Sequence, residues 1–172
     1  MMASGNTVTT SDEVYIALGA NLASAEYGAP RATLEAALAL LASQDITILR
    51  RSSWWQSSPQ PVSDQPDFVN GVVEVRTGLS PTDLLARLHR IESSCGRTRQ
   101  ERWEARVLDL DLIDYRGRVV SGTPVLPHPR LGDRLFVLLP LQEIAPNWRH
   151  PVSGAGLAEL ISAAYPLKIN KL

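Results

Sequence analysis

Residues 108–112 alternate leucine and aspartate, and this short stretch restricts the possible folds of the chain more than any other. Successive side chains of a β-strand point to opposite faces, so the leucines share one face while Asp109 and Asp111 share the other. A face of leucines needs an apolar layer to cover it. With a strand rise of ~3.3 Å per residue, the two aspartates lie roughly 6.5–7 Å apart along the strand. The pattern therefore predicts a sheet with one buried face and one face that presents two neighbouring carboxylates.

The remaining segments supply strands and helices in a definite order. Strands are predicted from short apolar or alternating runs at residues 14–18, 46–55, 68–75 and 107–115. Helices are predicted from Pro30 to residue 41, from the N-cap Ser80 to a stop at Gly96, and over residues 157–164. The order β-α-β-β-α-β indicates an α+β, ferredoxin-like core, in which helices pack on an antiparallel sheet and C-terminal additions follow.

Two long loops stand between these elements. Residues 56–66 contain three prolines and are too long for a plain connection, which is typical of a functional loop. Residues 97–106 are strongly charged and lead into the aspartate strand. Further along, residues 119–120 are predicted to pair back across a turn at residues 116–117, and residues 136–141 form an apolar run.

The charge balance and the hydropathy bear on possible partners. The chain has 17 Lys and Arg against 18 Asp and Glu, a formal net charge of −1. A nucleic-acid binder would carry a basic excess, so we expect no nucleic-acid partner. The most apolar stretch, residues 36–42, is far shorter than the ~20 residues that span a bilayer, so we expect no membrane partner.

The N-terminal residues and the single cysteine bear on location. Residues 1–12 show no signal-peptide pattern and Cys95 alone forms no internal disulfide, so a cytoplasmic location is expected. The same residues are polar, and we expect a disordered extension there, followed by a single domain over residues 13–172. From its small size, the protein is expected to be a monomer.

Asp109 and Asp111 are the first candidate site residues. Two carboxylates so close repel each other unless a cation lies between them, and hard oxygen ligands suit Mg²⁺ that is shared with substrate phosphates. The alternative is the solvated face of an amphipathic strand, where the charges only keep the sheet soluble. A lone Asp-x-Asp motif does not decide between these two interpretations.

The arginines upstream of the pair favour the first interpretation. Arginine guanidinium groups bind phosphate oxygens in a bidentate way, so a metal could take some oxygens of a nucleotide and the arginines others. The alternative is a solvated charged loop balanced by Glu101 and Glu104. The segment contains Arg97, Arg99, Arg102 and Arg106, with Trp103 among them. Since the chain has no Gly-x4-Gly-Lys-[Ser/Thr] phosphate loop, side chains and metal would have to hold a bound nucleotide.

At this point the chain resembles a known family, the 6-hydroxymethyl-7,8-dihydropterin pyrophosphokinases of the folate pathway. The strongest resemblance lies in residues 102–111, which read RWEARVLDLD and are similar to the family's signature segment. Four other segments agree with the family in order and spacing, and together they extend from about Tyr15 to Leu160. They are residues 15–22; Ser58 and Pro59 with residues 64–70; residues 90–92 with 96–97; and residues 127–130 with Arg134 and residues 136–141.

The resemblance implies transfer of the pyrophosphoryl group of ATP to the hydroxymethyl group of the pterin, with release of AMP and help from two Mg²⁺ ions. It also implies a role for each matching residue. Asp109 and Asp111 would hold the metals, and Arg97 and Arg106 would clamp the ATP phosphates. Further ATP contacts would come from Glu92, Arg99, Arg102, His128 and Arg134, and pterin contacts from Ser58, Phe68, Asn70, Trp103 and Phe136.

One departure from the family pattern leaves alternatives open. Glu104 and Ala105 follow Trp103, where the family commonly has glycine and then proline or alanine. A glutamate adds negative charge beside a phosphate-binding loop and removes the flexibility of glycine. A paralogue with altered or weak substrate use is therefore a second hypothesis. A third is a ferredoxin-like RNA-binding module, against which the net charge and the paired aspartates argue.

Overall fold

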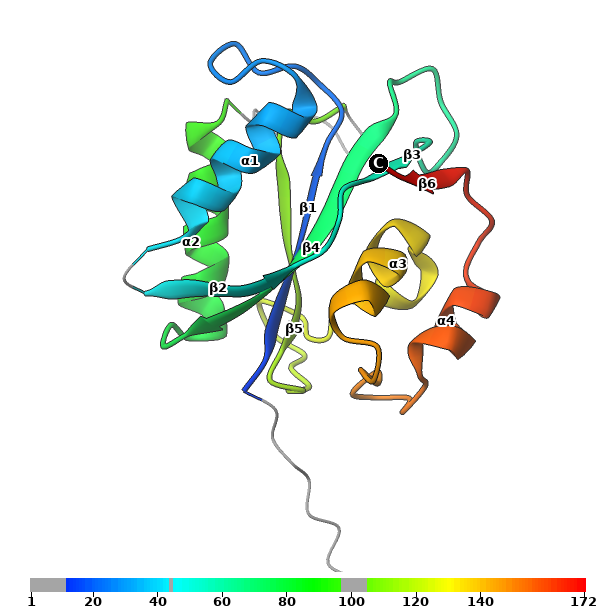
Figure 1. Cartoon of the computed structure of the whole chain (residues 1–172). Coiled ribbons are helices and arrows are strands. Elements are labelled where there is room, and N and C mark those ends of the chain that lie inside the picture. The colour runs from blue at the N-terminus through cyan, green and yellow to red at the C-terminus, as the bar shows by residue number, and fades with distance from the viewer. Residues whose placement is uncertain (1–11, 44, 97–104) are drawn as a thin grey trace, which may run out of the picture.

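A computed structural model describes residues 12–43, 45–96 and 105–172 of the chain (Figure 1). The expected disordered extension lies outside these residues, apart from Asp12. The elements follow in chain order as β1 (Val14–Ala20), α1 (Pro30–Leu41), β2 (Ile46–Arg51), β3 (Trp55–Ser57), β4 (Phe68–Thr77), α2 (Pro81–Ser94), β5 (Asp109–Tyr115), η1 (Leu131–Asp133), α3 (Leu135–Ile144), α4 (Leu157–Ala163) and β6 (Ile169–Lys171). Among the described residues, no helix has both the length and the apolar character needed to cross a bilayer.

The sheet confirms the ferredoxin-like prediction. Its strands follow the order β5-β1-β4-β3-β6, and β2 also pairs with β4. Each strand pair that the structure describes is antiparallel. β1 lies between β4 and β5, so the aspartate strand is held against the first strand of the chain, with Ala17 opposite Asp111 and Gly19 opposite Asp109.

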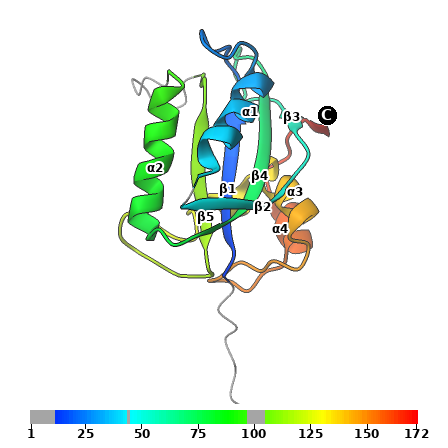
Figure 2. The same cartoon turned by 60° about the vertical axis from the view of Figure 1, so that its left-hand side comes forward.

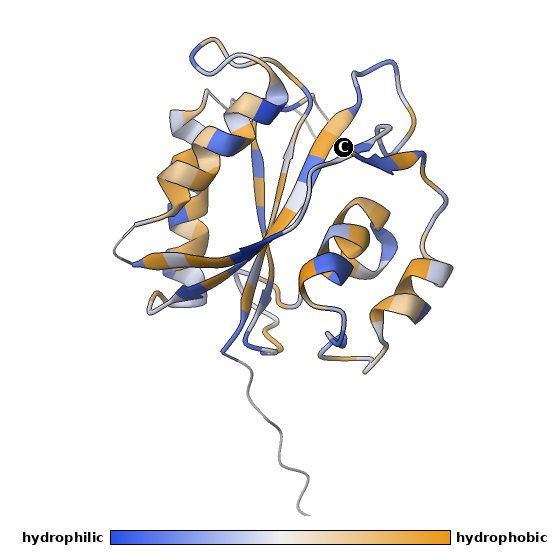
Figure 3. Ribbon diagram, in the orientation of Figure 1, coloured by the Kyte–Doolittle hydropathy of each residue, from blue (hydrophilic) through white to orange (hydrophobic). Residues whose placement is uncertain are grey.

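Helices cover both faces of the sheet (Figures 1 and 2). The helices α1 and α2 cover one face, where Leu108, Leu110 and Leu112 enter a large apolar core. The helices α3 and α4 cover part of the other face, where a second core forms around Leu138 and Leu141. Much of α1, α2 and α3 is coloured orange, for hydrophobic residues, in Figure 3. The leucine and aspartate faces of β5 are therefore separated as the alternation predicts.

Helix α2 has the predicted ends. The side chain of Ser80 accepts a hydrogen bond from the backbone N–H of Asp83 at 3.1 Å, which satisfies one of the free donors of the first turn. Gly96 follows the helix with a φ of +89°, a conformation that glycine adopts without a steric penalty. These ends place Glu92 one turn before the helix stops.

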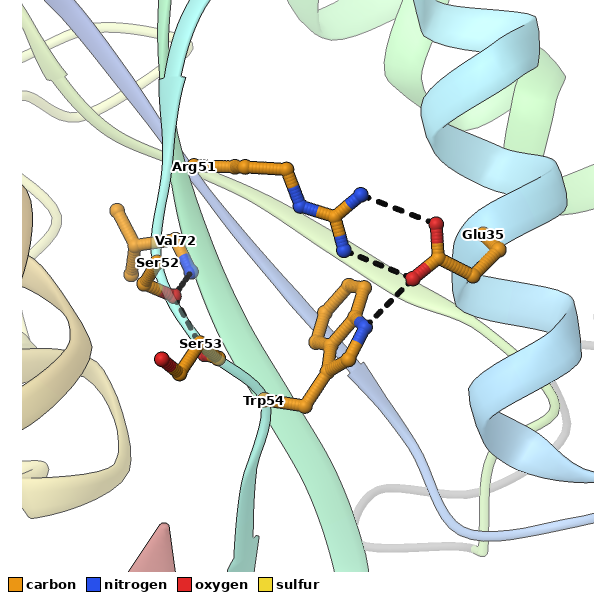
Figure 4. A network of polar contacts seen from close by, with 6 residues as sticks. All are labelled: Glu35, Arg51, Ser52, Ser53, Trp54 and Val72. Carbon is orange, nitrogen blue, oxygen red and sulfur yellow. Dashed lines mark hydrogen bonds and ion pairs between the residues drawn. The ribbon is translucent and has the colours of Figure 1, made fainter. Parts of the chain in front are cut away.

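The predicted strand at residues 46–55 is in fact two strands, β2 and β3. Between them Ser52 accepts a hydrogen bond from Val72 N at 3.0 Å, and Trp54 turns its indole into the core toward Glu35 of α1 (Figure 4). These side-chain contacts interrupt the regular ladder. The predicted loop at residues 56–66 is accordingly wrong at its start, since Gln56 and Ser57 belong to β3.

Three further elements differ from the predicted ones or were not predicted. The apolar run at residues 136–141 is part of helix α3, whose apolar residues are buried against the sheet and α4. Val120 exchanges hydrogen bonds with Leu126 instead of pairing back on β5, because the chain continues past the turn into its own small loop. The three-residue strand β6 pairs with β3, and its short length gives no sequence pattern.

Candidate active site

A pocket opens on the aspartate face of the sheet, beside the start of α3. Its cavity volume is about 150 Å³, and it is open to solvent. We call residues 58–67, between β3 and β4, the proline-rich loop, and it forms one wall. The lining residues come from five places: Ala17, Leu18 and Gly19 of β1; Ser57, Phe68 and Asn70 of β3 and β4; Ser58, Pro59, Gln60, Pro61, Ser63 and Gln65 of the proline-rich loop; Arg106, Asp109 and Asp111; and Arg134, Phe136 and Val137.

Asp109 and Asp111 form the acidic end of the pocket. Each has an arginine partner. Arg106 forms an ion pair with Asp109, and Arg134 Nη1 lies 3.4 Å from Asp111 Oδ2. Burial and the neighbouring Asp109 charge raise the pKa of Asp111 to about 6. A cation placed between the two carboxylates would relieve this repulsion.

The donor set at this end fits a metal that is shared with a substrate. In the parts of the chain that the structure covers, no three His, Cys, Asp or Glu side chains gather to form a complete protein cage for an ion. Mg²⁺ is commonly held by one or two carboxylates and completes its shell with water and substrate phosphates. The two aspartates are ligands of this kind.

Arg134 and His128 flank the acidic end. The Arg134 guanidinium lies 5.6 Å from the ring centroid of Phe136, in cation–π contact. The backbone N–H of His128 donates to Ile113 O at 2.8 Å, which anchors the loop to the end of β5. Burial and the positive charge of Arg134 lower the pKa of His128 to about 4, so the imidazole is neutral at pH 7. A neutral imidazole can donate or accept a hydrogen bond but adds no charge.

The opposite end of the pocket combines aromatic and amide groups. Phe68 and Phe136 both line it and are partly exposed there. Asn70 is buried, and its Nδ2 donates to Ser57 Oγ at 2.9 Å, which fixes the orientation of the amide. Gly19 lies across from this amide, where an added Cβ would be 3.4 Å from Asn70 Oδ1. An apolar slot with one fixed amide suits a flat heterocycle with a polar edge.

The structure brings most of the described candidate residues together in this one pocket. Those that line it are Ser58, Phe68, Asn70, Arg106, Asp109, Asp111, Arg134 and Phe136. His128 and Glu92 are described but do not line it. Glu92 is buried, and its Oε1 accepts a hydrogen bond from Leu110 N at 2.8 Å, so it holds α2 against β5. Arg97, Arg99, Arg102 and Trp103 lie outside the described residues.

Sequence reasoning missed several residues of this region, among them Ser57, Gln65 and Asn21. Ser57 and Gln65 line the pocket, and Asn21 is buried beside Arg106 with its side chain hydrogen-bonded. A signal existed for Asn21, because a polar residue directly after the apolar strand β1 needs a partner to be buried. For Ser57 the signal was hidden, since the strand that holds it has only three residues.

Comparisons with known proteins point to one family. A family model described as 7,8-dihydro-6-hydroxymethylpterin-pyrophosphokinase matches residues 15–146. A 2-amino-4-hydroxy-6-hydroxymethyldihydropteridine pyrophosphokinase of Haemophilus influenzae is 39% identical over 160 residues, which are 92% of this chain and 96% of that protein. The protein of the same name from Pseudomonas aeruginosa is 42% identical over 153 residues, 87% of this chain and 90% of that protein. The one from Synechocystis is 46% identical over 127 residues, 73% of this chain and 64% of that protein.

A solved structure shows the same fold. The crystal structure of HPPK-DHPS from Plasmodium falciparum superimposes with a TM-score of 0.65 and 14% sequence identity. The similarity covers 88% of this chain and 42% of that chain. At this identity the agreement concerns the fold, with its antiparallel sheet between helices.

Proposed function

This chain belongs to the 7,8-dihydro-6-hydroxymethylpterin-pyrophosphokinase family, and from that premise we propose that its pocket transfers pyrophosphate from ATP to the hydroxymethyl group of 6-hydroxymethyl-7,8-dihydropterin. The reaction releases AMP and belongs to folate biosynthesis. The observation that carries the proposal is the two-ended pocket, which has carboxylates and arginines at one end and aromatic and amide groups at the other. The comparisons support neither an altered paralogue nor an RNA-binding module.

The acidic end holds the metal and the phosphates. Asp109 and Asp111 would hold the two Mg²⁺ ions that the family resemblance implies, and the repulsion between the carboxylates supports this assignment. When bound at these two carboxylates, Mg²⁺ would supply neutralisation of the phosphate charge. Phosphoryl-type transfer depends on this neutralisation and on positioning more than on covalent chemistry.

The arginines complete the ATP side. Arg106 and Arg134 lie against the aspartates, so phosphate oxygens that approach the metals come within reach of two guanidinium groups. Arg97, Arg99 and Arg102 are assigned to ATP by the family resemblance. The family resemblance also assigns His128 and Glu92 to ATP. His128 adds a neutral hydrogen-bonding group, and the Glu92 carboxylate also holds the backbone of Leu110 in β5.

The other end binds the pterin. Phe68 and Phe136 supply apolar surface for the ring, and the amide of Asn70, which Ser57 orients, supplies hydrogen bonds for its polar edge. Ser58 lines the same wall. Trp103 is assigned to this side by the family resemblance. In this arrangement the hydroxymethyl group of the bound pterin would lie toward Asp109 and Asp111, which would lower the entropy cost of bringing the two reactants together.

The remaining expectations concern the protein as a whole. We propose that residues 13–172 act as one pyrophosphokinase domain and that the protein is a cytoplasmic monomer. The size of the chain and its net charge of −1 support action on small molecules without a nucleic-acid partner. Sedimentation at micromolar concentration would measure the oligomeric state directly.

The proposal is tested by identifying the nucleotide product. Purified protein is incubated with ATP, Mg²⁺ and 6-hydroxymethyl-7,8-dihydropterin, and AMP and ADP are separated. Stoichiometric AMP that requires both the pterin and the metal is expected. ADP as the product would mean transfer of a single phosphoryl group and would overturn the proposal, as would the absence of turnover while ATP still binds.

A further inference from the structure

Asn21 does not line the pocket, but its side chain bonds to two segments that do, those of Arg106 and Gln65. It follows β1 directly and is buried, with 3% of its surface exposed. Its Oδ1 accepts a hydrogen bond from the backbone N–H of Arg106 at 2.6 Å. Its Nδ2 donates to Gln65 Oε1 at 3.2 Å and to Pro66 O at 3.1 Å. The side chain therefore connects the residue before the aspartate strand with the far end of the proline-rich loop.

The backbone beside Asn21 strengthens the first of these connections. The N–H groups of Asn21 and Leu22 both donate to Arg106 O, at 2.9 and 3.1 Å. The backbone N–H and the backbone carbonyl of Arg106 are thus both hydrogen-bonded, while its guanidinium forms the ion pair with Asp109. Small displacements of this peptide would move the guanidinium relative to the aspartates.

The amide of asparagine is the group that this position needs. One carbonyl oxygen faces a donor, and one NH₂ group with two hydrogens faces two acceptors, so each side of the amide meets its complement. Aspartate would present a second oxygen to the Pro66 carbonyl, so this carbonyl would lose its donor and face a negatively charged oxygen instead. Gln65 can turn its own amide to compensate, but Pro66 has no N–H to offer.

We infer that Asn21 is a positioning residue, which sets Arg106 on the phosphate side and the proline-rich loop on the pterin side relative to each other. The inference rests on the proposed function for the identity of the two sides. Arg106 and Gln65 both line the pocket, and they are far apart in the sequence. A single side chain that bonds to both segments fixes the distance between the two binding walls. Displacements of about 1 Å at such a point are costly in transfer reactions that depend on alignment.

Two substitutions separate the connections. In Asn21→Asp the oxygen that accepts from Arg106 N remains, while the donors to Gln65 and Pro66 are lost. The KM for the pterin is expected to rise roughly threefold to tenfold, as for a lost buried hydrogen bond, with the KM for ATP changed less. In Asn21→Ala both connections are lost, so both KM values are expected to rise. Asn147→Ala, at an exposed position after α3, is the matched control and should leave both values unchanged.

A second readout tests the inference without turnover. The backbone N–H of Arg106 is expected to be protected from hydrogen exchange in the wild type and in Asn21→Asp, and to exchange faster in Asn21→Ala. This pattern would hold even if the protein formed no AMP, so failure of the proposed function and failure of the inference are distinguishable. Unchanged KM values and unchanged exchange in Asn21→Ala would overturn the inference. A fall in melting temperature with unchanged KM values, at a temperature where each variant is folded, would also overturn it and mean that Asn21 only stabilises the fold.

Discussion

Arg134 Nη1 lies 3.4 Å from Asp111 Oδ2, so an arginine at the start of α3 faces a carboxylate at the middle of β5. The same guanidinium contacts the ring of Phe136. One residue therefore touches the acidic end of the pocket and an aromatic residue of the other end. Its positive charge attracts the carboxylate of Asp111, while its planar guanidinium group lies over the ring of Phe136.

Substitutions at Arg134 should separate these two effects. Arg134→Met removes the positive charge, so the KM for ATP is expected to rise roughly tenfold to hundredfold, as for loss of a charge-assisted hydrogen bond. Arg134→Lys keeps a charge but loses the planar group and should affect ATP less than the methionine variant does. Steady-state kinetics with each substrate varied in turn would measure this. Equal KM values for ATP in both variants would mean that the charge of Arg134 does not act on the nucleotide.

Asp111 and Asp114 lie on the same strand, and they should respond to substitution in opposite ways. Asp111→Asn is expected to lower turnover by about a thousandfold or more, since metal binding is worth several kcal/mol to such a reaction. Without Mg²⁺ the same variant should melt at or above the wild-type temperature, because the substitution removes a partly buried carboxylate that is repelled by Asp109. Turnover by product analysis and melting by circular dichroism would measure both effects.

Asp114 is the matched control for that experiment. Its carboxylate accepts hydrogen bonds from Trp148 Nε1 at 2.8 Å and from Gly117 N at 3.0 Å, away from the pocket. Asp114→Ala should cost about 1–3 kcal/mol of stability by leaving a buried donor unpaired, with kcat unchanged where the protein is folded. Retained turnover in Asp111→Asn would place the metal elsewhere.

The sequence alone predicted the central strands, helices α1 and α2 on one face of the sheet, and the aspartate pair, because each has a clear local cause. Alternation predicts the two faces of β5, and the N-cap Ser80 and the stop at Gly96 define α2. The residues that gather in the pocket were predicted largely by the family resemblance. Their assembly follows from the antiparallel pairing of β1 with β4 and β5, which brings the ends of distant segments together.

The features that were missed depend on contacts between distant segments. The division between β2 and β3 follows from Trp54, which packs against Gly71 and bonds to Glu35, and none of these three is near the others in sequence. Asn21 likewise acquires its role only when the Arg106 and Pro66 segments are in place. Patterns along the chain do not contain such information, because it arises from tertiary packing.

Glu35 should make stability depend on pH in the acid range. Its carboxylate accepts hydrogen bonds from Arg51 and from Trp54 Nε1, which lower its pKa from 4.5 to about 2 in the folded state (Figure 4). As the pH falls from about 4.5 to 2, the unfolded chain takes up the proton first, so this contribution to stability is lost over that range. Melting temperatures from pH 6 to pH 2 should fall more steeply for the wild type than for Glu35→Gln. Parallel curves would show that the network does not favour the ionised carboxylate.

Gly71 should tolerate no side chain while Trp54 is present. A Cβ at this position would lie 2.6 and 2.8 Å from ring atoms of Trp54, closer than packed atoms allow. Gly71→Ala should lower the free energy of unfolding by about 1–3 kcal/mol through overpacking, as measured by urea denaturation. Gly78→Ala is the matched control, since a Cβ there meets nothing within 4 Å. If the two alanine variants are equally stable, the indole does not pack on Gly71 as described.

Ser57 should matter for the pterin through Asn70. Its Oγ accepts a hydrogen bond from Asn70 Nδ2 at 2.9 Å, and both residues are buried. Ser57→Ala frees the amide to rotate, so the KM for the pterin is expected to rise roughly threefold to tenfold, the usual effect of one buried hydrogen bond, while the KM for ATP stays the same. Asn70→Ala should have a larger effect, because it removes the amide itself.

In a double-mutant cycle the Ser57→Ala substitution should add little once Asn70 is alanine, since the Ser57 hydroxyl then has no amide to orient. Fully additive effects on the KM for the pterin would mean that Ser57 contacts the pterin directly. An unchanged KM for the pterin in both single variants would mean that Ser57 and Asn70 do not take part in binding it.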